Sequence, residues 1–379
     1  MASGARHGRE GSARRSSRRD RVSADRPGVI RRVAVVGAGA WGTALAVHLA
    51  RAGYAPRLWV FEPELLGLIV GTRENPWYLP GVRLPDGVAP TGSVAGAVDG
   101  AEVVVVAVPS HVFRAVAGSL GPHLAPGARV VSATKGIEEE GPRRMSEILA
   151  EVLPPGARDR IAVVSGPTFA VEVAHERPTA AVVASKHPEL ARELQQALAT
   201  AAFRLYTQSD VVGVELGGAL KNVMAVAAGI SDGLELGDNA RAALLTRGLA
   251  EMTRLGASLG ARAATFAGLA GVGDLILTCT GALSRNRRLG LALACGTSLA
   301  EWQATTRSVA EGVRTTRAAL ALAEPIGVAT PITREVGAVL FGGKDPRAAL
   351  ESLLGRDVRP EDDDVAGGRA LFAREAGRG

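Results

Sequence analysis

Lys221 has the surroundings in this sequence that best suit acid–base chemistry. It is the only charged residue between Glu215 and Asp232, in a long apolar stretch that predicts a helix. Its neighbours three and four positions away carry no acid and are Gly217, Gly218, Met224 and Ala225. No local ion pair can therefore form, and a lysine without a partner among apolar groups has a lowered pKa. Lys221 is thus a candidate to exchange a proton with a carbonyl or an alcohol, the alternative being a lysine that reaches solvent from the end of a packed face.

Ser284, Arg285 and Asn286 begin another predicted helix and have the residue types that bind anions. Serine is a natural N-cap, and the first backbone N–H groups of a helix, with an arginine and an asparagine beside them, form a phosphate cradle. Basic residues at the positive end of the helix dipole are unfavourable unless an anion joins them, which favours phosphate binding over a solvated basic turn. Asp274 begins a further apolar segment, either as an acid at a helix N-terminus or as a group that holds a substrate hydroxyl or orients Lys221.

Gly37, Gly39 and Gly42 follow the short apolar strand expected at 33–36, at G-x-G-x-x-G spacing, and a helix-forming run comes next. This strand–turn–helix context is the one that dinucleotide binding requires. Gly37 permits the sharp turn, Gly39 lets a pyrophosphate approach, and Gly42 lets the helix pack against the strand. The pattern predicts a dinucleotide site, and the alternative is a glycine-rich turn in another α/β protein.

Glu62 lies about 20 residues beyond the last glycine, at the end of the strand expected at 57–61, where an acid hydrogen-bonds the adenosine ribose in dinucleotide-binding folds. A carboxylate at this position also repels a 2′-phosphate. The alternative is a solvated carboxylate in a loop.

The elements that must position these residues alternate between strand and helix as far as about residue 208, which predicts a doubly wound parallel sheet. After the first two strands, others are expected at 101–108, 129–133, 161–164, 179–184 and 203–207. Residues 72–93 are expected to form a loop, with short irregular strands within it as the alternative. Because ligands bind beyond the carboxyl ends of such strands, one crevice can collect the glycine turn, Pro109-Ser110, Lys135 and Ser165-Gly166-Pro167. Ser110 is expected to cap the helix that begins near His111.

From Asp210 onward the pattern predicts helices only, over roughly 211–230, 239–259, 268–279, 284–295, 299–303, 309–323 and 332–341. The domain organisation expected is a disordered leader at 1–30, a Rossmann-type domain at 31–209, an all-helical domain at 210–354 and a flexible charged tail at 355–379.

Composition limits the class of protein. Residues 1–32 hold ten arginines against three acids, so the net charge of +6 comes from the leader and the remainder is near neutral, which argues against a nucleic-acid platform. The leader lacks the apolar core of a secretory signal; an organellar transit peptide is the alternative to a dispensable start.

The cysteines, Cys279 and Cys295, form no metal-ligand pattern, so we expect no metal and a cytoplasmic location. No stretch reads as a membrane span.

Short motifs occur in one order along residues 31–345: Gly37–Ala44, Asn75–Gly81, Ala107–Ser110, Thr134–Gly136, Ser165–Ala170, Leu220–Asn222, Gly271–Leu275, Ser284–Asn286 and Val309–Gly312. Together they closely resemble the bacterial-type, NAD(P)-dependent glycerol-3-phosphate dehydrogenase family. The resemblance implies hydride transfer between NAD(P)H and dihydroxyacetone phosphate. The product, sn-glycerol 3-phosphate, would supply phospholipid synthesis.

The resemblance also implies roles for individual residues. Lys221 would be the general acid/base, Lys135 would contact both cofactor and substrate, and Arg285 would bind the phosphate near the cofactor. With the glycine turn and Glu62 included, the expected cofactor set is Gly37, Gly39, Ala40, Trp41, Gly42, Glu62, Lys135, Ala170, Arg285, Val309 and Glu311. The expected substrate set is Lys135, Gly166, Thr168, Lys221, Asp274, Ser284, Arg285 and Asn286.

The chain departs from the family pattern after the second strand, where many relatives carry a basic residue and this chain has Phe61 and Glu62. We therefore expect NAD(H) to be used at least as well as NADP(H).

Two other functions are possible for the same sequence pattern: a dehydrogenase of the same two-domain plan acting on a 3-hydroxy acid or sugar acid, and a non-catalytic dinucleotide sensor whose basic leader contacts nucleic acid. Ser284-Arg285-Asn286 argues against the first, and the presence of Lys135 and Lys221 argues against the second. A homodimer is expected from the apolar helical domain.

Overall fold

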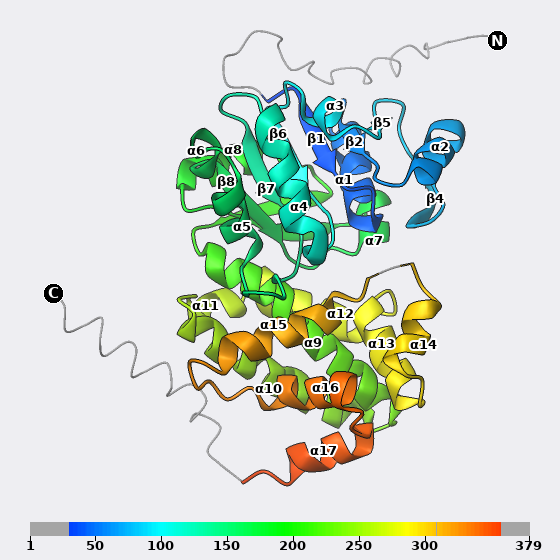
Figure 1. Ribbon diagram of the computed structural model, residues 1–379, viewed down its shortest axis with the longest axis vertical. Coiled ribbons are helices and arrows are strands. Elements are labelled where there is room, and N and C mark those ends of the chain that lie inside the picture. The colour runs from blue at the N-terminus through cyan, green and yellow to red at the C-terminus, as the bar shows by residue number, and fades with distance from the viewer. Residues whose placement is uncertain (1–29, 308, 358–379) are drawn as a thin grey trace, which may run out of the picture.

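The structure is a computed structural model that describes residues 30–307 and 309–357. A domain built on a sheet and a domain of helices lie one above the other along the long axis of the molecule (Figure 1). The expectations for the leader at 1–29 and for the tail at 358–379 lie outside the described residues. Ile30, assigned to the leader, is 5% exposed and packs in the core of the first domain.

The first domain holds an eight-stranded sheet in the order β10-β9-β8-β7-β6-β1-β2-β5, with a two-stranded sheet of β3 and β4 beside it. The strands are β1 (Val33–Val36), β2 (Arg57–Trp59), β3 (Glu74–Asn75), β4 (Leu79–Arg83), β5 (Ala89–Thr91), β6 (Val103–Val106), β7 (Arg129–Ser132), β8 (Ile161–Ser165), β9 (Thr179–Ala184) and β10 (Phe203–Gln208). The helices are α1 (Ala40–Arg51), α2 (Pro63–Thr72), α3 (Val94–Val98), α4 (Ser110–Leu120), α5 (Met145–Val152), α6 (Pro155–Arg158), α7 (Ala170–Ala174) and α8 (Pro188–Leu198), with a 3-10 turn at Gly121–His123.

Helices cover both faces of this sheet, which explains why its central strands are apolar throughout. Along β1, Val33 and Val35 pack into one core with α1 and α8, whereas Ala34 and Val36 pack into a second core with α4 and α5. Because successive side chains of a strand point to opposite faces, a strand buried on both sides needs apolar residues at every position. The expected doubly wound sheet is present.

Two strands, β9 and β10, run opposite to the other strands of the sheet, which differs from the expectation of a wholly parallel sheet. β9 pairs antiparallel with β8, while the other neighbours in the sheet pair in parallel. A parallel connection needs a crossover of about a dozen or more residues over a face of the sheet. Here the link through α7 stays at the carboxyl edge and packs on α1, so β9 starts from that edge and runs back. This link holds Gly166 and Thr168 at the edge where β8 ends.

The second domain is helical, as the sequence predicts. Its helices are α9 (Val211–Gly233), α10 (Gly237–Ser258), α11 (Ala263–Phe266), a π-helical turn at Leu269–Gly273, α12 (Asp274–Thr280), α13 (Arg285–Ala294), α14 (Leu299–Ala304), α15 (Glu311–Ala323), α16 (Pro331–Gly342) and α17 (Pro346–Leu354). Asp210 caps α9, because its side chain accepts a hydrogen bond from the N–H of Gly213 at 2.9 Å. The helix α17 was not expected.

Helix α9 forms the axis of the second domain, and α10, α12, α13 and α15 pack around it (Figure 1). Glycines allow the closest of these contacts: a Cβ at Gly229 would lie 2.0 Å from the carbonyl oxygen of Arg287, and one at Gly290 would lie 2.1 Å from that of Val226. By length and composition α9 could cross a membrane, but 83% of its most apolar window is buried inside the protein. Its apolar character is that of a core helix.

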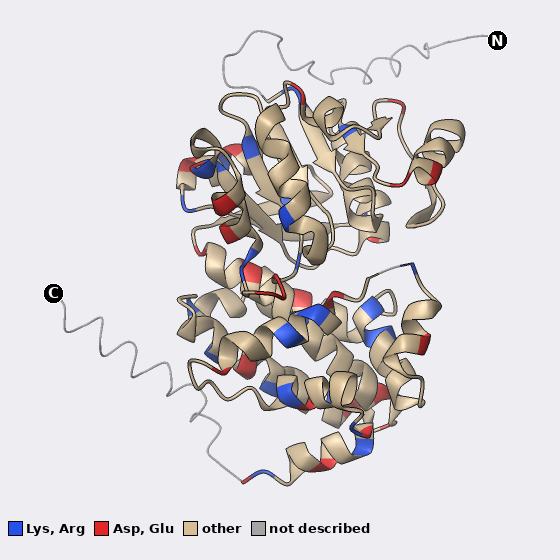
Figure 2. Cartoon of the chain, in the orientation of Figure 1, with Lys and Arg blue, Asp and Glu red and all other residues tan. Residues whose placement is uncertain are grey.

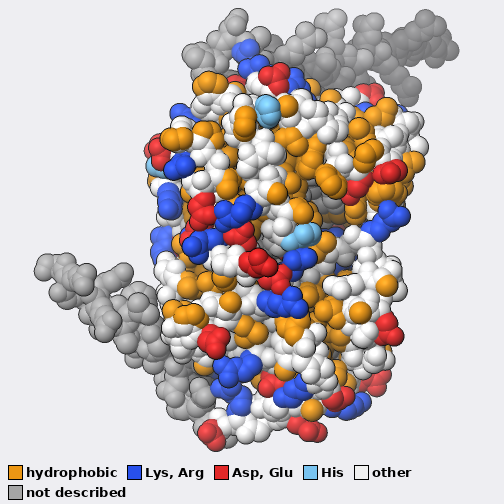
Figure 3. All heavy atoms as spheres, viewed as in Figure 1, with side chains coloured by type: hydrophobic (Ala, Val, Ile, Leu, Met, Phe, Trp, Pro, Cys, Tyr) orange, Lys and Arg blue, Asp and Glu red, His pale blue; other side chains and the backbone are white. Residues whose placement is uncertain are grey.

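The two domains meet at a junction rich in charge. The segment after β7 carries acidic residues toward the helices below it (Figure 2), and charged side chains form a band across this region of the surface (Figure 3). Glu139 pairs with Arg314 at 2.9 Å and Arg317 at 2.7 Å on α15, and Arg144 pairs with Glu215 on α9 at 2.6 Å. These contacts fix α9 and α15 relative to the carboxyl edge of the sheet.

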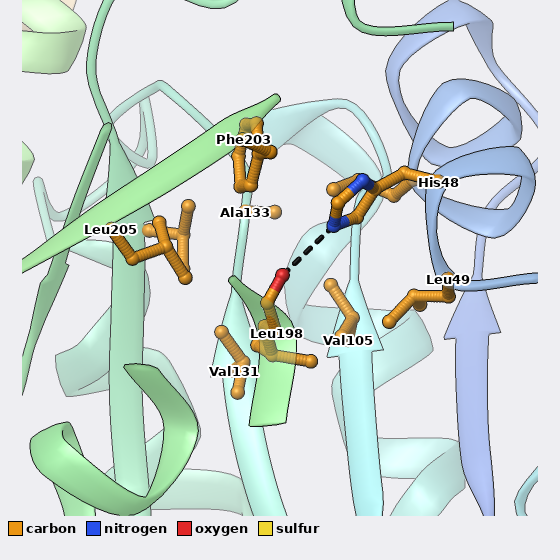
Figure 4. Close-up of a pocket in the computed structure, with 10 residues that line it drawn as sticks. His48, Leu49, Val105, Val131, Ala133, Leu198, Phe203 and Leu205 are labelled. Atoms are coloured by element: carbon orange, nitrogen blue, oxygen red, sulfur yellow. Dashed lines mark hydrogen bonds between the residues drawn. The ribbon is translucent and has the colours of Figure 1, made fainter. Parts of the chain in front are cut away.

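A small cavity of about 20 Å³ lies between α1 and the sheet (Figure 4). Apolar side chains line it, and the imidazole of His48 lies at its edge, hydrogen-bonded to the carbonyl oxygen of Leu198 at 2.8 Å. Burial lowers the pKa of His48. The cavity is a packing void of the core.

Candidate active site

Lys221 is buried at the junction, with 6% of its surface exposed, and it is not free of partners. Its Nζ donates to Oδ1 of Asp274 at 2.6 Å and to Oγ1 of Thr278 at 2.8 Å. The expectation of an unpaired ammonium is therefore wrong. The reasoning from neighbours on the same helix excluded a local partner, but α12 supplies one from more than fifty residues further along the chain.

The same carboxylate holds a second lysine, from the other domain. Nζ of Lys135 donates to Oδ2 of Asp274 at 2.8 Å, to the carbonyl oxygen of Gly166 at 2.6 Å and to Oγ1 of Thr168 at 3.1 Å. Asp274 is 1% exposed. Two ammonium groups on one buried carboxylate leave a net positive charge, which suits an anionic substrate and an oxygen that becomes negative during reaction.

Two glycines on α9, one turn before Lys221, make this meeting possible. A Cβ at Gly217 would lie 2.5 Å from the carbonyl oxygen of Ala270, in the π-helical turn that precedes Asp274. A Cβ at Gly218 would lie 2.3 Å from Oγ of Ser165 and 3.7 Å from the side chain of Lys135. The absence of side chains at these two positions lets Asp274 and Lys135 approach Lys221.

The environment of Lys221 adjusts its proton affinity. Burial lowers its pKa, the carboxylate of Asp274 opposes that effect and the charge of Lys135 adds to it, so that the pKa of Lys221 is about 8. An ammonium has three N–H groups, and Asp274 and Thr278 accept two of them. The third N–H can then donate to a substrate oxygen, and a pKa near 8 lets the proton move at physiological pH.

The start of α13 has the N-cap that the sequence predicts. Ser284 is the N-cap, and its Oγ accepts from the N–H of Arg287 at 3.2 Å. The N–H groups of Arg285 and Asn286 lie in the first turn, where a helix offers them no internal partner. Burial lowers the pKa of Arg285, because removing a guanidinium from water destabilises its charged form. A bound anion would offset this destabilisation.

The side chain of Asn286 is tied to the protein more than the sequence suggests. Its Nδ2 donates to Oδ1 of Asn222 at 2.9 Å, and its Oδ1 accepts from the N–H of Gly312 at 2.9 Å. Asn222 in turn donates to the carbonyl oxygen of Lys135 at 3.3 Å. The asparagine thus joins α9, α13 and α15 behind the lysines, and one amide hydrogen remains for a ligand.

Glu311 connects the helical domain to the sheet domain. Its Oε1 accepts from the N–H of Ser110 at 2.9 Å and its Oε2 from the hydroxyl of Ser110 at 2.5 Å. Burial raises the pKa of Glu311, and these bonds and the nearby Arg285 oppose that rise. The expectation that Ser110 caps its own helix is wrong: Pro109 holds the N-cap position, and the hydroxyl of Ser110 binds Glu311 instead.

The glycine turn has the geometry that a dinucleotide needs. Gly37 has a φ of +112°, and a Cβ at Gly42 would lie 1.9 Å from the carbonyl oxygen of Gly37, so neither position admits a side chain without strain. A Cβ at Gly39 would meet no protein atom within 4 Å. This open space lies at the N-terminus of α1, where Ala40 and Trp41 form the first turn, and it fits a pyrophosphate.

Asn75 is a residue of the cofactor side to which the sequence analysis gave no role. It is fully buried, and its Nδ2 donates to the carbonyl oxygen of Ala38 at 2.7 Å and to Oγ1 of Thr43 at 2.8 Å. These bonds brace the glycine turn from outside. The sequence indicated Asn75 only as a member of the Asn75–Gly81 motif. The fold shows which groups its amide contacts.

Three other predicted residues lie on elements other than those that carry the two lysines. Glu62 precedes α2 and accepts a hydrogen bond from the hydroxyl of Tyr78 at 2.9 Å. Ala170 begins α7, and Val309 lies just before α15. Within the described residues, no hydrogen bond joins these three to Lys135 or Lys221, and no group of three or more His, Cys, Asp or Glu is placed to hold a metal ion.

Comparison with known families covers most of the chain. Residues 32–191 match the family described as the N-terminus of NAD-dependent glycerol-3-phosphate dehydrogenase, and residues 210–351 match the C-terminus of the same family.

Individual relatives agree with this match. The glycerol-3-phosphate dehydrogenase (NAD(P)+) of Geobacter metallireducens is 52% identical over 330 residues, which cover 87% of this chain and 98% of the relative. The crystal structure of glycerol-3-phosphate dehydrogenase from Coxiella burnetii is 40% identical, with a TM-score of 0.83, and the match covers 87% of this chain and 100% of that one. A ketopantoate reductase structure from Ralstonia eutropha is 18% identical with a TM-score of 0.55, and shares the fold.

Proposed function

The chain belongs to the NAD-dependent glycerol-3-phosphate dehydrogenase family, and we propose that Lys221 is the general acid/base of its reaction. The protein is an oxidoreductase that interconverts dihydroxyacetone phosphate and sn-glycerol 3-phosphate with NAD(P)H. The observation that carries the proposal is the buried carboxylate of Asp274, which holds Lys221 and Lys135 from two different domains.

The proposed chemistry follows from the positions of the side chains. The substrate phosphate binds at the start of α13, where Ser284, Arg285 and Asn286 supply backbone N–H groups, an amide and a guanidinium. When bound, the nicotinamide supplies the hydride that reduces the carbonyl carbon. Lys221 donates its free N–H proton to the carbonyl oxygen, and Lys135 adds positive charge beside the oxygen as it becomes negative.

The other residues expected in the two sets have supporting roles in this proposal. Gly166 and Thr168 line the substrate site by fixing Nζ of Lys135, while Val309 and Glu311 lie on the nicotinamide side. Asp274 keeps both lysines in place and shares their charge. On release of the alcohol, the amine of Lys221 regains a proton from water.

The experiment that tests this function is an assay of NADH oxidation with dihydroxyacetone phosphate beside a panel of 2- and 3-oxo acids. We expect turnover with dihydroxyacetone phosphate and competition by sn-glycerol 3-phosphate. Turnover of an oxo acid in preference to the phosphate ester would reassign the substrate.

We also propose that NAD(H) serves at least as well as NADP(H), because Glu62 lies where a carboxylate binds ribose hydroxyls and repels a 2′-phosphate. The measurement is kcat/KM for NADH and NADPH at saturating dihydroxyacetone phosphate. A preference for NADPH above tenfold would refute the role given to Glu62.

The cellular setting is proposed in the same terms. We expect a cytoplasmic homodimer of a sheet domain at 31–209 and a helical domain at 210–354, supplying glycerol 3-phosphate for phospholipid synthesis. Support for the dimer comes from large apolar side chains on the surface of the helical domain; they include Ile276, Leu283, Phe341 and Leu354. Light scattering of the purified protein tests the dimer, and rescue of a glycerol auxotroph tests the supply of glycerol 3-phosphate.

A further inference from the structure

The region beyond β2 holds a second carboxylate whose setting the reaction described above does not explain. β1 and β2 are neighbours in the sheet, with Val36 paired to Trp59, and the N–H of Gly37 donates to the carbonyl oxygen of Trp59 at 3.2 Å. Glu62 follows three residues after Trp59. It therefore lies beside the glycine turn, at the side of the site that receives the adenosine half of a dinucleotide in this fold.

The carboxylate of Glu62 is not used to build its own helix. Glu62 occupies the N-cap position of α2 with an extended backbone, yet its side chain accepts no hydrogen bond from that helix. Its Oε1 accepts from Oη of Tyr78 at 2.9 Å. Among the described residues, no Lys or Arg forms an ion pair with this carboxylate within 4.0 Å, so the side chain that holds it is a neutral hydroxyl.

Tyr78 is itself tied to the glycine turn. Its N–H donates to Oδ1 of Asn75 at 3.0 Å, and Asn75 donates to the carbonyl oxygen of Ala38 at 2.7 Å and to Thr43 at 2.8 Å. An unbroken series of hydrogen bonds thus runs from the turn that faces the pyrophosphate to the carboxylate of Glu62. The position of that carboxylate is set relative to the turn, not by the flexible glutamate alone.

We propose that Tyr78 is a positioning residue that fixes Glu62 to receive the ribose hydroxyls of NAD(H), and that this pair selects against the 2′-phosphate of NADP(H). The inference rests on the cofactor preference proposed above and names the residue that enforces it. A glutamate loses side-chain entropy when it is ordered, and a partner that orders it beforehand removes that cost from binding. With one oxygen engaged, Oε2 remains to accept from the ribose.

Tyr78 keeps its proton across the range in which the enzyme can be assayed. Burial and the bond to Glu62 raise the pKa of Tyr78 to about 12. The hydroxyl therefore remains a donor, and the contact does not change with pH in an ordinary assay.

Arg307 is a basic group that faces this end of the site from the helical domain. Its guanidinium lies 4.4 Å from the ring centroid of Trp77, and its charge acts against the raised pKa of Tyr78. An arginine near the ribose could attract a 2′-phosphate, so Arg307 is the competing determinant of cofactor choice. Its side chain is exposed, so solvent screens its charge.

The test is a double-mutant cycle on the ratio of kcat/KM for NADH to that for NADPH. We expect Glu62→Gln to lower this ratio about tenfold, because a charged acceptor of the ribose hydroxyls is lost. We expect Tyr78→Phe to lower it about fivefold through KM for NADH with kcat unchanged, and the double variant to match Glu62→Gln within about twofold, because the tyrosine acts only through the glutamate.

Matched controls separate this role from a structural one. Glu64→Gln removes an exposed acid from the first turn of the same helix, and Tyr54→Phe removes a hydroxyl that donates to the carbonyl oxygen of Ala197 at 2.8 Å in the same domain. Both should leave the ratio unchanged. Arg307→Gln should change kcat/KM for the two cofactors alike.

The outcomes distinguish the two proposals. If Glu62→Gln leaves the ratio unchanged, the cofactor preference proposed for Glu62 fails, and this inference fails with it. If Glu62→Gln lowers the ratio but Tyr78→Phe does not, or if the two effects simply add, only the role of Tyr78 is overturned. A ratio that responds to Arg307→Gln alone would assign the selection to the helical domain.

Discussion

Asp274 and Glu62 are the two carboxylates on which the proposed site depends, and their surroundings differ. Asp274 is 1% exposed and binds two ammonium groups, at 2.6 Å and 2.8 Å, that come from both domains. Glu62 is partly exposed and accepts one hydrogen bond, at 2.9 Å, from a neutral hydroxyl of its own domain.

The difference shows what burial does to a charge. Coulomb interactions are several times stronger in a protein interior than at a surface in contact with water, so Asp274 can govern the proton affinity of a lysine. Glu62 is less buried, so it acts through the position of its carboxylate and through a modest repulsion of a 2′-phosphate. This suits a choice between two cofactors. Changes at Asp274 should therefore alter the reaction rate and the fold, and changes at Glu62 only the cofactor preference.

The largest effect is expected at Lys221. Lys221→Met removes the proton donor and should lower kcat by about 1,000-fold or more, while folding and NADH binding persist. Steady-state kinetics, thermal unfolding and NADH titration measure the three quantities. Lys186→Met, at an exposed lysine, is the control and should change none of them. Near-normal turnover in Lys221→Met would remove this lysine from the proposed role.

Asp274→Asn tests whether the shared carboxylate is needed for the fold as well as for the rate. It leaves the buried ammonium of Lys221 and the partly buried ammonium of Lys135 without their counter-charge, so we expect a loss of about 3–5 kcal/mol in unfolding free energy and about 100-fold in kcat. Denaturant unfolding and kinetics measure the two. Asp238→Asn is the matched control, since Asp238 forms a surface pair and its side chain is 92% exposed. An effect equal to that of the control would refute the comparison between the two acids.

The pH dependence follows from the pKa of Lys221, which is about 8. Reduction needs the ammonium, so its kcat/KM should be constant below that value and fall about tenfold per pH unit above it. Oxidation of glycerol 3-phosphate needs the free amine and should instead rise up to the same value and then level off. In Asp274→Asn the break should move to lower pH, because the carboxylate that raises the pKa of Lys221 is gone. An unmoved break would show that Asp274 does not act on this proton.

The smallest effect is expected at Gly39, in the glycine turn. Gly39→Ala places a methyl group in space that no protein atom occupies, so we expect unfolding free energy to change by less than about 0.5 kcal/mol and KM for NADH to rise about tenfold. Gly42→Ala should do the opposite and destabilise the fold, because its Cβ would meet the carbonyl oxygen of Gly37. Equal stability losses in both variants would mean that the space at Gly39 is structural.

Much of the fold could be predicted from local pattern. The apolar strands, the glycine turn and the helices of the second half appear near their expected positions, because each depends on residues close together in the chain. The reversed direction of β9 and β10 did not follow from their composition, since the composition of a strand is the same in either direction. The direction of β9 is decided by the path of the link before it, and β10 runs parallel to β9.

The features of the site can also be separated into those that depend on residues close together in the chain and those that depend on the fold. The sequence by itself determined that Lys221 has no partner on its own helix, that Gly39 leaves room at a helix N-terminus, and that Ser284 caps a helix. Those conclusions need only helical spacing and the absence of a side chain.

Only the tertiary structure decided that Asp274 holds Lys221 and Lys135 together, that Glu311 binds Ser110, and that Tyr78 fixes Glu62. Each of these contacts joins separate elements of the fold, and three of the four join residues more than fifty positions apart. The physical reason is that a charge interacts with whatever the fold brings near it, and distance along the chain does not set distance in space.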